Sequence, residues 1–483
     1  MTWIVLAAPL LLGLCLVSIF FHERSALSEK LALAFSTGLG ALTVLMFLLA
    51  HSRIPLTLRS ILSALFLSAG LLSVSLIKMM RFCLSRDDLK VLFDLKRLRL
   101  SLMEALLGLL IGFKLVFAFY SALIKPLVDI DAIQFYAVVA KGIFVDKTFL
   151  TPYLRQFMGD KPPLPYLLQG WAFIGQNSLD DAWMKLVYPC LFAGLIAIFY
   201  SALRRYFPRI FCLLFTFLLS GLPFLLYHAG TAYADLTMTF YFAAGTIYLF
   251  LFMKEFGRGD KGRAFSDLPI ALLLLGLCVW VKRAGLVLAG MDLLVLGSFL
   301  LSSRAALSRD DRARALRALA LFAAVVAPWL CQGQVATLAR ILFSIAGPTS
   351  GDTIVAAVRV HSPPSLARTG EILRIFARNS LLHGNWQLLW ALFAAALAFF
   401  PRRCLSKPLS YLLAMILLGL AALLVQFESG EMFQWLSDGT LLDRLVMNFA
   451  PVALFFCAEA ALPSLLETPA GSGSRPRATD RCP

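Results

Sequence analysis

Acidic, basic and aromatic side chains are concentrated in one stretch of this chain, between residues 129 and 169. It contains D-I-D-A-I-Q-F-Y-A-V-V-A-K from Asp129 to Lys141 and, after a short loop, G-D-K-P-P-L-P-Y-L-L-Q from Gly159 to Gln169. An ionised carboxylate can accept a proton as a general base, and a positioned ammonium can bind a phosphate. The stretch therefore predicts a site that combines proton transfer with phosphate binding.

The first half of this stretch predicts a helix that lies along the membrane surface. Ile130, Ile133 and Ala137 share one face at helical spacing, and Asp131 falls in the first turn. The helix N-terminus favours an ionised carboxylate there. An alternative is that Asp131 or Asp129 only caps the helix. The spacing does not choose between the two as the base.

The second half places a lysine beside three prolines. Pro162, Pro163 and Pro165 predict an extended, rigid segment that directs the ammonium of Lys161 at a phosphate. The alternative is a proline-rich loop whose lysine extends towards the lipid headgroups.

Three further polar points interrupt the apolar sequence. Asp235 ends the tight connection that starts at His228, and it is either a helix N-cap or part of an acceptor site. The pair Lys282-Arg283 stands in W-V-K-R-A-G-L, where cations are costly unless they face an anion or water. A lipid phosphate would supply that anion, and a plain turn is the alternative. Arg444, in D-G-T-L-L-D-R, either makes bidentate contacts with a phosphate or anchors a helix end among headgroups.

Composition shows that these residues belong to a membrane protein. The chain has 483 residues, of which 60% are hydrophobic and 15% charged, and its mean hydropathy is +0.81. Repeated apolar runs of about 20 residues are typical of transmembrane helices, and strand-like alternation is missing. The net charge of +16 lies mainly in short connections between these runs, which indicates membrane topology rather than nucleic-acid binding. The nine cysteines show no metal-ligand spacing.

Hydropathy predicts an all-α polytopic bundle of about 11–13 transmembrane helices with juxtamembrane helices on the outer face. The hydrophobic segments are 3–21, 31–50, 59–79, 101–121, 183–203, 209–227, 236–253, 268–281, 284–301, 315–330, 386–400, 408–426 and 444–462. The part 268–301 is ambiguous, because it fits two short helices or one helix and a re-entrant piece.

Orientation follows from the positive-inside rule. The connections rich in Lys and Arg are predicted to be cytoplasmic: 78–99, 204–209, 254–263, 302–317, 402–407 and the C-terminal tail. The remaining connections would then be outside, together with the candidate site residues: 51–58, 122–182, 228–235, 331–385 and 427–443.

We expect three regions in the chain. Residues 1–100 form N-terminal transmembrane helices, of which the first is retained rather than cleaved, and an amphipathic cytoplasmic segment at 85–100. Residues 101–462 form the catalytic module, with outer loops 122–182 and 331–385, and 463–483 form a disordered cytoplasmic tail.

The order of these motifs resembles a known enzyme family. D-A-I-Q-F-Y-A-V-V-A-K, K-P-P-L-P-Y-L-L, A-Y-A-D-L, V-K-R-A-G-L and T-L-L-D-R are similar, in sequence order, to bacterial membrane glycosyltransferases of the GT-C class. The nearest branch is the protein O-mannosyltransferase and lipid A aminoarabinose transferase group. The resemblance covers residues 101 to 462. The family's catalytic loop usually follows its first span, whereas about three extra spans precede it here.

The resemblance implies a reaction and roles for individual residues. An inverting transfer would move a sugar from a polyprenyl-phosphate donor to an acceptor hydroxyl on the extracytoplasmic face of a bacterial inner membrane. No cofactor would be required, although two nearby carboxylates can bind a divalent metal. The acceptor would be an envelope glycan, a lipid or a protein. The implied roles are catalysis by Asp131 or Asp129, binding of the donor phosphate by Lys161, Arg444, Arg283 and Lys282, and acceptor or supporting contacts from Tyr136, Asp235 and Tyr166.

Two other classes fit a protein with this many spans. A transporter or flippase of a lipid-linked or anionic substrate would place ionisable residues near the bilayer midplane, as Lys282-Arg283 suggests. An O-antigen-type polymerase or ligase would use basic outer loops and a pyrophosphate-linked donor.

Overall fold

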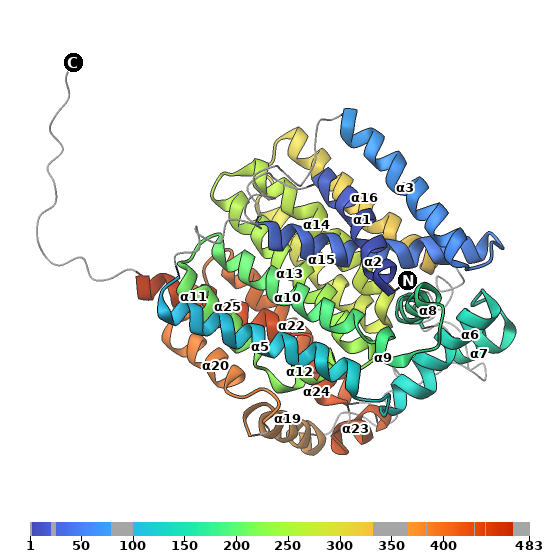
Figure 1. Cartoon of the computed structure of the whole chain (residues 1–483). Coiled ribbons are helices and arrows are strands. Elements are labelled where there is room, and N and C mark those ends of the chain that lie inside the picture. Colours follow the sequence, from blue (N-terminus) through green and yellow to red (C-terminus); the bar gives the residue numbers. More distant parts are fainter. Residues whose placement is uncertain are drawn as a thin grey trace, which may run out of the picture.

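The computed structural model describes residues 2–20, 26–78, 100–159, 161–331, 366–382, 384–428, 430–439 and 441–466. All regular secondary structure in these ranges is helical (Figure 1). The elements are α1 (Thr2–Phe20), α2 (Leu27–His51), α3 (Leu58–Lys78), α5 (Leu102–Ile124), the π-helix η2 (Ala132–Ala137), α6 (Val138–Asp146), α7 (Pro152–Met158), α8 (Leu164–Gln176), α9 (Asp181–Met184), α10 (Val187–Arg204), α11 (Arg209–Ser220), α12 (Pro223–Ala229), α13 (Ala234–Gly257), α14 (Lys261–Val281), α15 (Arg283–Ser302), α16 (Arg309–Leu330), α19 (Leu366–Leu381), α20 (Leu389–Phe399), α21 (Pro401–Cys404), α22 (Leu409–Phe427), α23 (Gly430–Ser437), α24 (Leu442–Val446) and α25 (Ala450–Leu466).

The helices confirm that the chain is an all-α membrane protein. In the described ranges nine helices are long and apolar enough to cross a bilayer, α11 and α12 form one further span bent by 71°, and three shorter helices are also apolar. Each of the predicted hydrophobic segments corresponds to one of these. The ambiguous part 268–301 is resolved as two helices of 21 and 20 residues, α14 and α15, separated only by Lys282 in an extended conformation.

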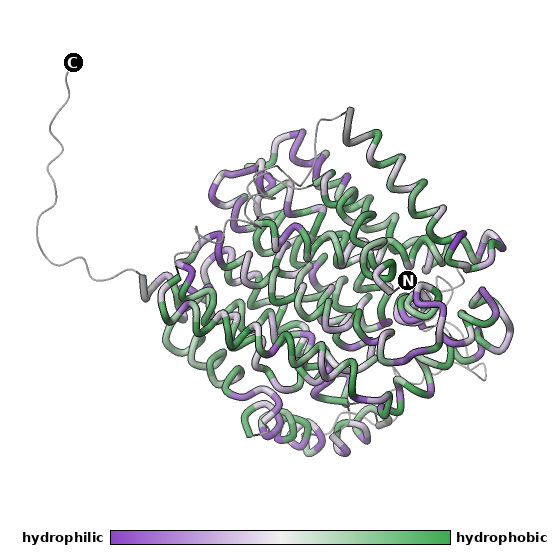
Figure 2. Tube along the Cα trace, viewed as in Figure 1, coloured by the Kyte–Doolittle hydropathy of each residue, from purple (hydrophilic) through white to green (hydrophobic). Residues whose placement is uncertain are grey.

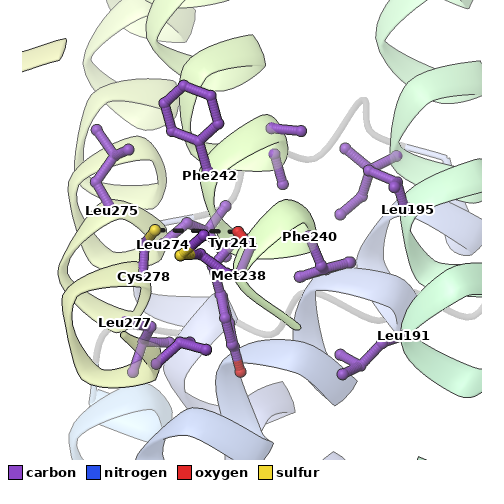
Figure 3. Close-up of a cluster of buried hydrophobic side chains, with 14 of the residues drawn as sticks. Leu191, Leu195, Met238, Phe240, Tyr241, Phe242, Leu274, Leu275, Leu277 and Cys278 are labelled. Atoms are coloured by element: carbon purple, nitrogen blue, oxygen red, sulfur yellow. Dashed lines mark hydrogen bonds between the residues drawn. The ribbon is translucent and has the colours of Figure 1, made fainter. Parts of the chain in front are cut away.

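Helix α13 is the central helix of the bundle. Its sequence is apolar on all sides, and every residue of its most hydrophobic 18-residue window is buried. It packs against α10, α14, α15, α22 and α25. Figure 3 shows part of this core, where Met238 and Phe240 of α13 lie between Leu191 of α10 and Leu274 of α14. Because α13 contacts so many neighbours, its first residues are held rigidly at one end of the bundle.

Peripheral helices present apolar side chains outwards. In α5, only 22% of the most hydrophobic 18-residue window is buried. Leu109, Phe113 and Val116 of this helix are each at least two-thirds exposed. Figure 2 shows hydrophobic residues along the helices and more hydrophilic ones at helix ends and connections. An exposed apolar belt of this kind is the surface that lipid chains cover.

Two glycines allow α1 and α2 to pack closely. A Cβ atom added to Gly38 would lie 1.8 Å from the carbonyl oxygen of Pro9, and one on Gly13 would lie 1.6 Å from that of Ala34. Small residues at helix crossings permit such backbone contact in membranes. The pair packs in turn against α8 and α14.

The structure corrects some predicted boundaries. The last apolar helix is α25, which begins at Ala450 rather than residue 444 and continues to Leu466, so Arg444 lies in the separate short helix α24. The prolines after Lys161 do not form an extended segment. Pro163 has helical backbone angles, and Pro165 lies in the first turn of α8, where its missing N–H has no cost.

Three predicted features lie wholly or mostly outside the described residues. They are the amphipathic segment at 85–100, most of the outer loop 331–385, and most of the tail after residue 463.

Candidate active site

Four charged side chains from distant parts of the chain meet where several helices begin or end. Asp131 immediately precedes η2, Asp235 lies in the first turn of α13, and Arg444 belongs to α24. Lys282 is the single residue between α14 and α15. Asp131, Asp235 and Arg444 come from predicted outer connections or their borders, and Lys282 comes from the part 268–301. The rigid α13 and α14 position Asp235 and Lys282.

Arg444 connects the two carboxylates. Its Nη1 lies 2.7 Å from Oδ2 of Asp131, while its Nε and Nη2 donate to Oδ2 of Asp235 at 3.1 and 2.9 Å. The ammonium of Lys282 donates to the other oxygen of Asp235 at 2.6 Å. The guanidinium also lies 4.8 Å from the ring centroid of Tyr233. We call Asp131, Asp235, Lys282 and Arg444 the ion cluster.

The two carboxylates of the ion cluster differ in access. The side chain of Asp131 is 32% exposed, whereas that of Asp235 is 2% exposed. Asp235 is therefore enclosed by its two cations, while Asp131 keeps an open side on which another molecule can bind. Burial opposes the charge of Arg444, but the carboxylates, Asp235 above all, raise the pKa of its guanidinium above the ordinary value.

The capping alternatives do not hold for these carboxylates. Asp131 occupies the N-cap position of η2 but makes no capping hydrogen bond, because its carboxylate is paired with Arg444. The N-cap of α13 is Tyr233, so Asp235 is the second residue of the helix rather than its cap. A carboxylate in the first turn still interacts favourably with the helix N-terminus.

Asp129 has separate surroundings. Its Oδ1 accepts a hydrogen bond of 2.6 Å from the hydroxyl of Tyr227 on α12. The ammonium of Lys125 lies 4.2 Å from the centroid of the same tyrosine ring. Asp129 is thus held outside the ion cluster, and Asp131 is the carboxylate that the cluster presents.

Lys161 lies next to the ion cluster without joining its ion pairs. Its ammonium is 4.3 Å from the ring centroid of Phe135 on η2. Partial burial lowers the pKa of Lys161, and the nearby charge of Asp131 opposes this shift. No carboxylate of the described residues lies within ion-pair distance of this ammonium. Lys161 therefore contributes a positive charge that is not neutralised by contact.

A cavity of about 370 Å³ opens beside Lys161. Its lining is aromatic and basic and includes Phe47, His51, Phe149, Arg155 and Trp329. Cavities of this size hold small molecules, and a few polar groups on an otherwise apolar wall usually orient them.

Two buried tyrosines pack against each other where η2 meets α8. The rings of Tyr136 on η2 and Tyr166 on α8 are 5.4 Å apart, and both residues are buried. Burial, with a further contribution from Asp235, raises the pKa of Tyr136 well above its usual value, so this hydroxyl stays protonated. The hydroxyl of Tyr166 has no hydrogen-bond partner among the described residues.

The remaining predicted site residue is Arg283. Arg283 is the first residue of α15, is partly buried and is not a member of the ion cluster. As for a metal, no group of three or more His, Cys, Asp or Glu side chains suited to one occurs in the described part of the chain.

Sequence reasoning missed three aromatic residues that contact the site. Tyr227 binds Asp129, Tyr233 stacks on Arg444, and Phe135 lies against Lys161. A signal was present in Y-H-A-G-T-A-Y-A-D, where two tyrosines precede the Asp235 carboxylate in a connection only a few residues long.

Comparisons with known proteins complete the description. No protein-family model and no curated protein sequence matches the chain. Two solved structures are similar to it: ArnT from Cupriavidus metallidurans in the apo state, and the archaeal oligosaccharyltransferase AglB from Archaeoglobus fulgidus in complex with an inhibitory peptide and a dolichol-phosphate. For ArnT the identity is 17% and the TM-score 0.39, over 74% of this chain and 77% of the other. For AglB the values are 16% and 0.41, over 76% of this chain and 52% of the other, so the chain spans about half of AglB.

Proposed function

We propose that this chain is an integral membrane glycosyltransferase that moves a sugar from a polyprenyl-phosphate donor to an acceptor hydroxyl. The observation that carries the proposal is the ion cluster, which presents a partly exposed Asp131 beside Lys161, whose ammonium forms no ion pair with the described residues. A base for the acceptor and a cation for the leaving phosphate thus lie next to each other, beside a cavity that suits a small molecule.

In the reaction we propose, Asp131 is the general base. Its carboxylate takes the proton of the acceptor hydroxyl as the acceptor oxygen bonds to the anomeric carbon. The bond between that carbon and the phosphate oxygen breaks, and its electron pair leaves with the lipid phosphate. Attack opposite the leaving group inverts the configuration. A positioned base contributes roughly 100- to 10,000-fold in rate.

Two cations then have different roles. Lys161 binds the phosphate directly, and its charge stabilises the negative charge that grows on the leaving group. Arg444 is already shared between Asp131 and Asp235, so it orients the base in the absence of donor. When the donor phosphate binds, it competes for the guanidinium and leaves the Asp131 carboxylate free to contact the acceptor hydroxyl. No divalent metal is needed in this scheme, because cations supply the charge.

We further propose that the site faces the outer side of a bacterial inner membrane. The arginine- and lysine-rich connections 254–263 and 302–317 lie at the other ends of α13, α14 and α15, the spans that begin or end at Asp235 and Lys282. The ion cluster also lies at span ends rather than in mid-membrane, which favours an enzyme over a transporter.

The test is transfer by purified protein in lipid nanodiscs, measured as loss of radiolabelled sugar from a polyprenyl phosphate in the presence of an envelope extract. Asp131→Asn should abolish transfer while the protein still binds the donor. The matched control is Asp181→Asn, because Asp181 is equally exposed at 33% and is also ion-paired, with Lys141 at 3.0 Å. Asp129→Asn tests the remaining candidate base.

Wild-type turnover in Asp131→Asn would remove Asp131 from the mechanism. A transporter would instead move the labelled lipid across the bilayer with the sugar bond intact, and a polymerase or ligase would require the pyrophosphate-linked donor. Addition of EDTA should leave turnover unchanged.

A further inference from the structure

A second polar cavity lies at the opposite end of the bundle. It has a volume of about 400 Å³. Helix α13 connects the two places, with Asp235 near its start and Lys254 near its end. The difference of 19 positions between them corresponds to about 28 Å of helix, close to the roughly 30 Å thickness of the hydrocarbon core. This cavity is therefore at the other membrane boundary, on the side of the cation-rich connections.

The lining of this cavity is strongly basic. Its polar residues come from the C-terminal end of α13, from α21 and the connection between α21 and α22, from α25, and from the connection between α10 and α11. Four of the lining residues, Lys254, Arg258, Arg403 and Lys407, are basic, and one, Glu459, is acidic, which leaves three positive charges in excess. The rest of the lining is largely apolar or aromatic and includes Phe207, Phe250, Pro408, Leu409 and Pro463.

One lysine is held in the wall. The ammonium of Lys254 lies 2.5 Å from Oε2 of Glu459 and 3.5 Å from the ring centroid of Tyr206. The hydroxyl of Tyr206 in turn donates to Glu255 at 2.5 Å. Lys254 is thus largely neutralised, and its contacts give the cavity a fixed shape.

Two other cations have no such compensation. Arg258 lies 4.4 Å from the ring centroid of Tyr206, and Lys407 lies 5.7 Å from that of Tyr411. Neither has a carboxylate within ion-pair distance among the described residues. The positive-inside rule explains why cytoplasmic connections contain cations. It does not require that cations from separate helices line the same cavity.

We propose that this cavity binds a phosphate group, with Arg258 and Lys407 as its direct partners and the apolar wall facing an attached acyl chain. An acidic phospholipid of the adjacent leaflet and a free phosphate share this chemistry. Such a ligand would connect α13 with the α21–α22 connection and α25. Because α13 also carries Asp235, occupancy would stabilise the helix on which the ion cluster is built.

The test compares three probes by thermal unfolding of the purified full chain in detergent and by native mass spectrometry. The probes are short-chain phosphatidylglycerol, phosphatidylcholine of the same chain length, and inorganic phosphate. The variant Arg258→Gln with Lys407→Gln removes the two uncompensated cations. The control Arg402→Gln with Arg312→Gln removes the same charge from exposed residues outside the cavity.

We expect phosphatidylglycerol to stabilise the wild type and the control and to bind the cavity variant about tenfold or more weakly, because charge-assisted bonds to phosphate are strong. Equal stabilisation by inorganic phosphate would identify a free phosphate as the ligand. Equal behaviour of the cavity variant and the control would overturn the proposal, as would no preference of the wild type for any phosphate-bearing anion over phosphatidylcholine. The test does not use sugar transfer, so its failure leaves the proposed enzyme activity unaffected.

Discussion

Replacement of Asp235 by asparagine is the sharpest test of the ion cluster as a structural unit. The change keeps the shape of the side chain and removes the charge that Lys282 and Arg444 share. Loss of one partner from a buried ion pair typically costs 3–5 kcal/mol. We expect the lower end, about 3 kcal/mol, because Arg444 retains Asp131 and because the Lys282 and Arg444 side chains are 23% and 21% exposed.

The free energy of unfolding can be measured by titration with SDS in mixed micelles, followed by tryptophan fluorescence. The matched control is again Asp181→Asn, whose partner Lys141 is 37% exposed. An exposed pair of this kind contributes only about 0–1 kcal/mol. Equal costs for the two variants would refute the view that burial makes the ion cluster structurally important.

A double variant and the pH dependence of stability distinguish the loss of charge from the loss of packing in Asp235→Asn. In Asp235→Asn with Lys282→Gln, the unpaired cation is also gone, so the double variant should lose less stability than the sum of the single changes. Burial lowers the pKa of Lys282 from 10.5, and Asp235 opposes that shift. Without Asp235 the folded protein releases this proton at a lower pH than the unfolded chain. The stability of Asp235→Asn should therefore rise with pH towards the lysine's ordinary value, more steeply than that of wild type. A charge effect would be contradicted if the stability losses of the two single variants were strictly additive. It would also be contradicted if the stabilities of wild type and Asp235→Asn changed in parallel with pH.

Two further predictions concern helix packing and the donor site. Gly38→Ala should destabilise the protein by about 1–3 kcal/mol in the same titration, because its Cβ would meet the Pro9 carbonyl at 1.8 Å. Gly70→Ala, where nothing lies within 4 Å, should be neutral or slightly stabilising. A larger loss of stability in Gly70→Ala than in Gly38→Ala would contradict close packing of α1 on α2. If Lys161 binds the donor phosphate, transfer should fall as pH rises through a pKa below 10.5, because burial lowers that pKa and the charged form is lost. Lys161→Arg should keep its transfer activity at the high pH at which the wild type loses it. If the two proteins lost activity at the same pH, this role of Lys161 would be excluded.

The membrane fold was predictable because its signal is local. Each span is a run of apolar residues long enough to cross the bilayer, and the backbone must satisfy its hydrogen bonds within that run. For the same reason a single lysine could not reveal whether 268–301 was two short helices or one helix and a re-entrant piece. In the structure the break falls at Lys282, whose ammonium donates to the Asp235 carboxylate.

The candidate site was predictable in part. Asp131 and Lys161 stood out because charged residues are rare and costly beside apolar spans. The role of Arg444 was not visible, since a guanidinium at a helix end is equally suited to a phosphate, a headgroup or a carboxylate. The fold placed it between Asp131 and Asp235, more than 200 residues away.

Residue types and their order along the chain were thus enough to predict a multi-span α-helical membrane protein, which the structure confirms, and to single out the segment for which we propose acid, base and phosphate chemistry. Tertiary packing alone decided which carboxylate is enclosed, which one is open, and that Lys161 has no carboxylate within ion-pair distance in the described part of the chain. The physical reason is that hydropathy acts over neighbouring residues, whereas an ion pair depends on how distant helices pack, and contacts of that kind leave no periodic trace in the sequence.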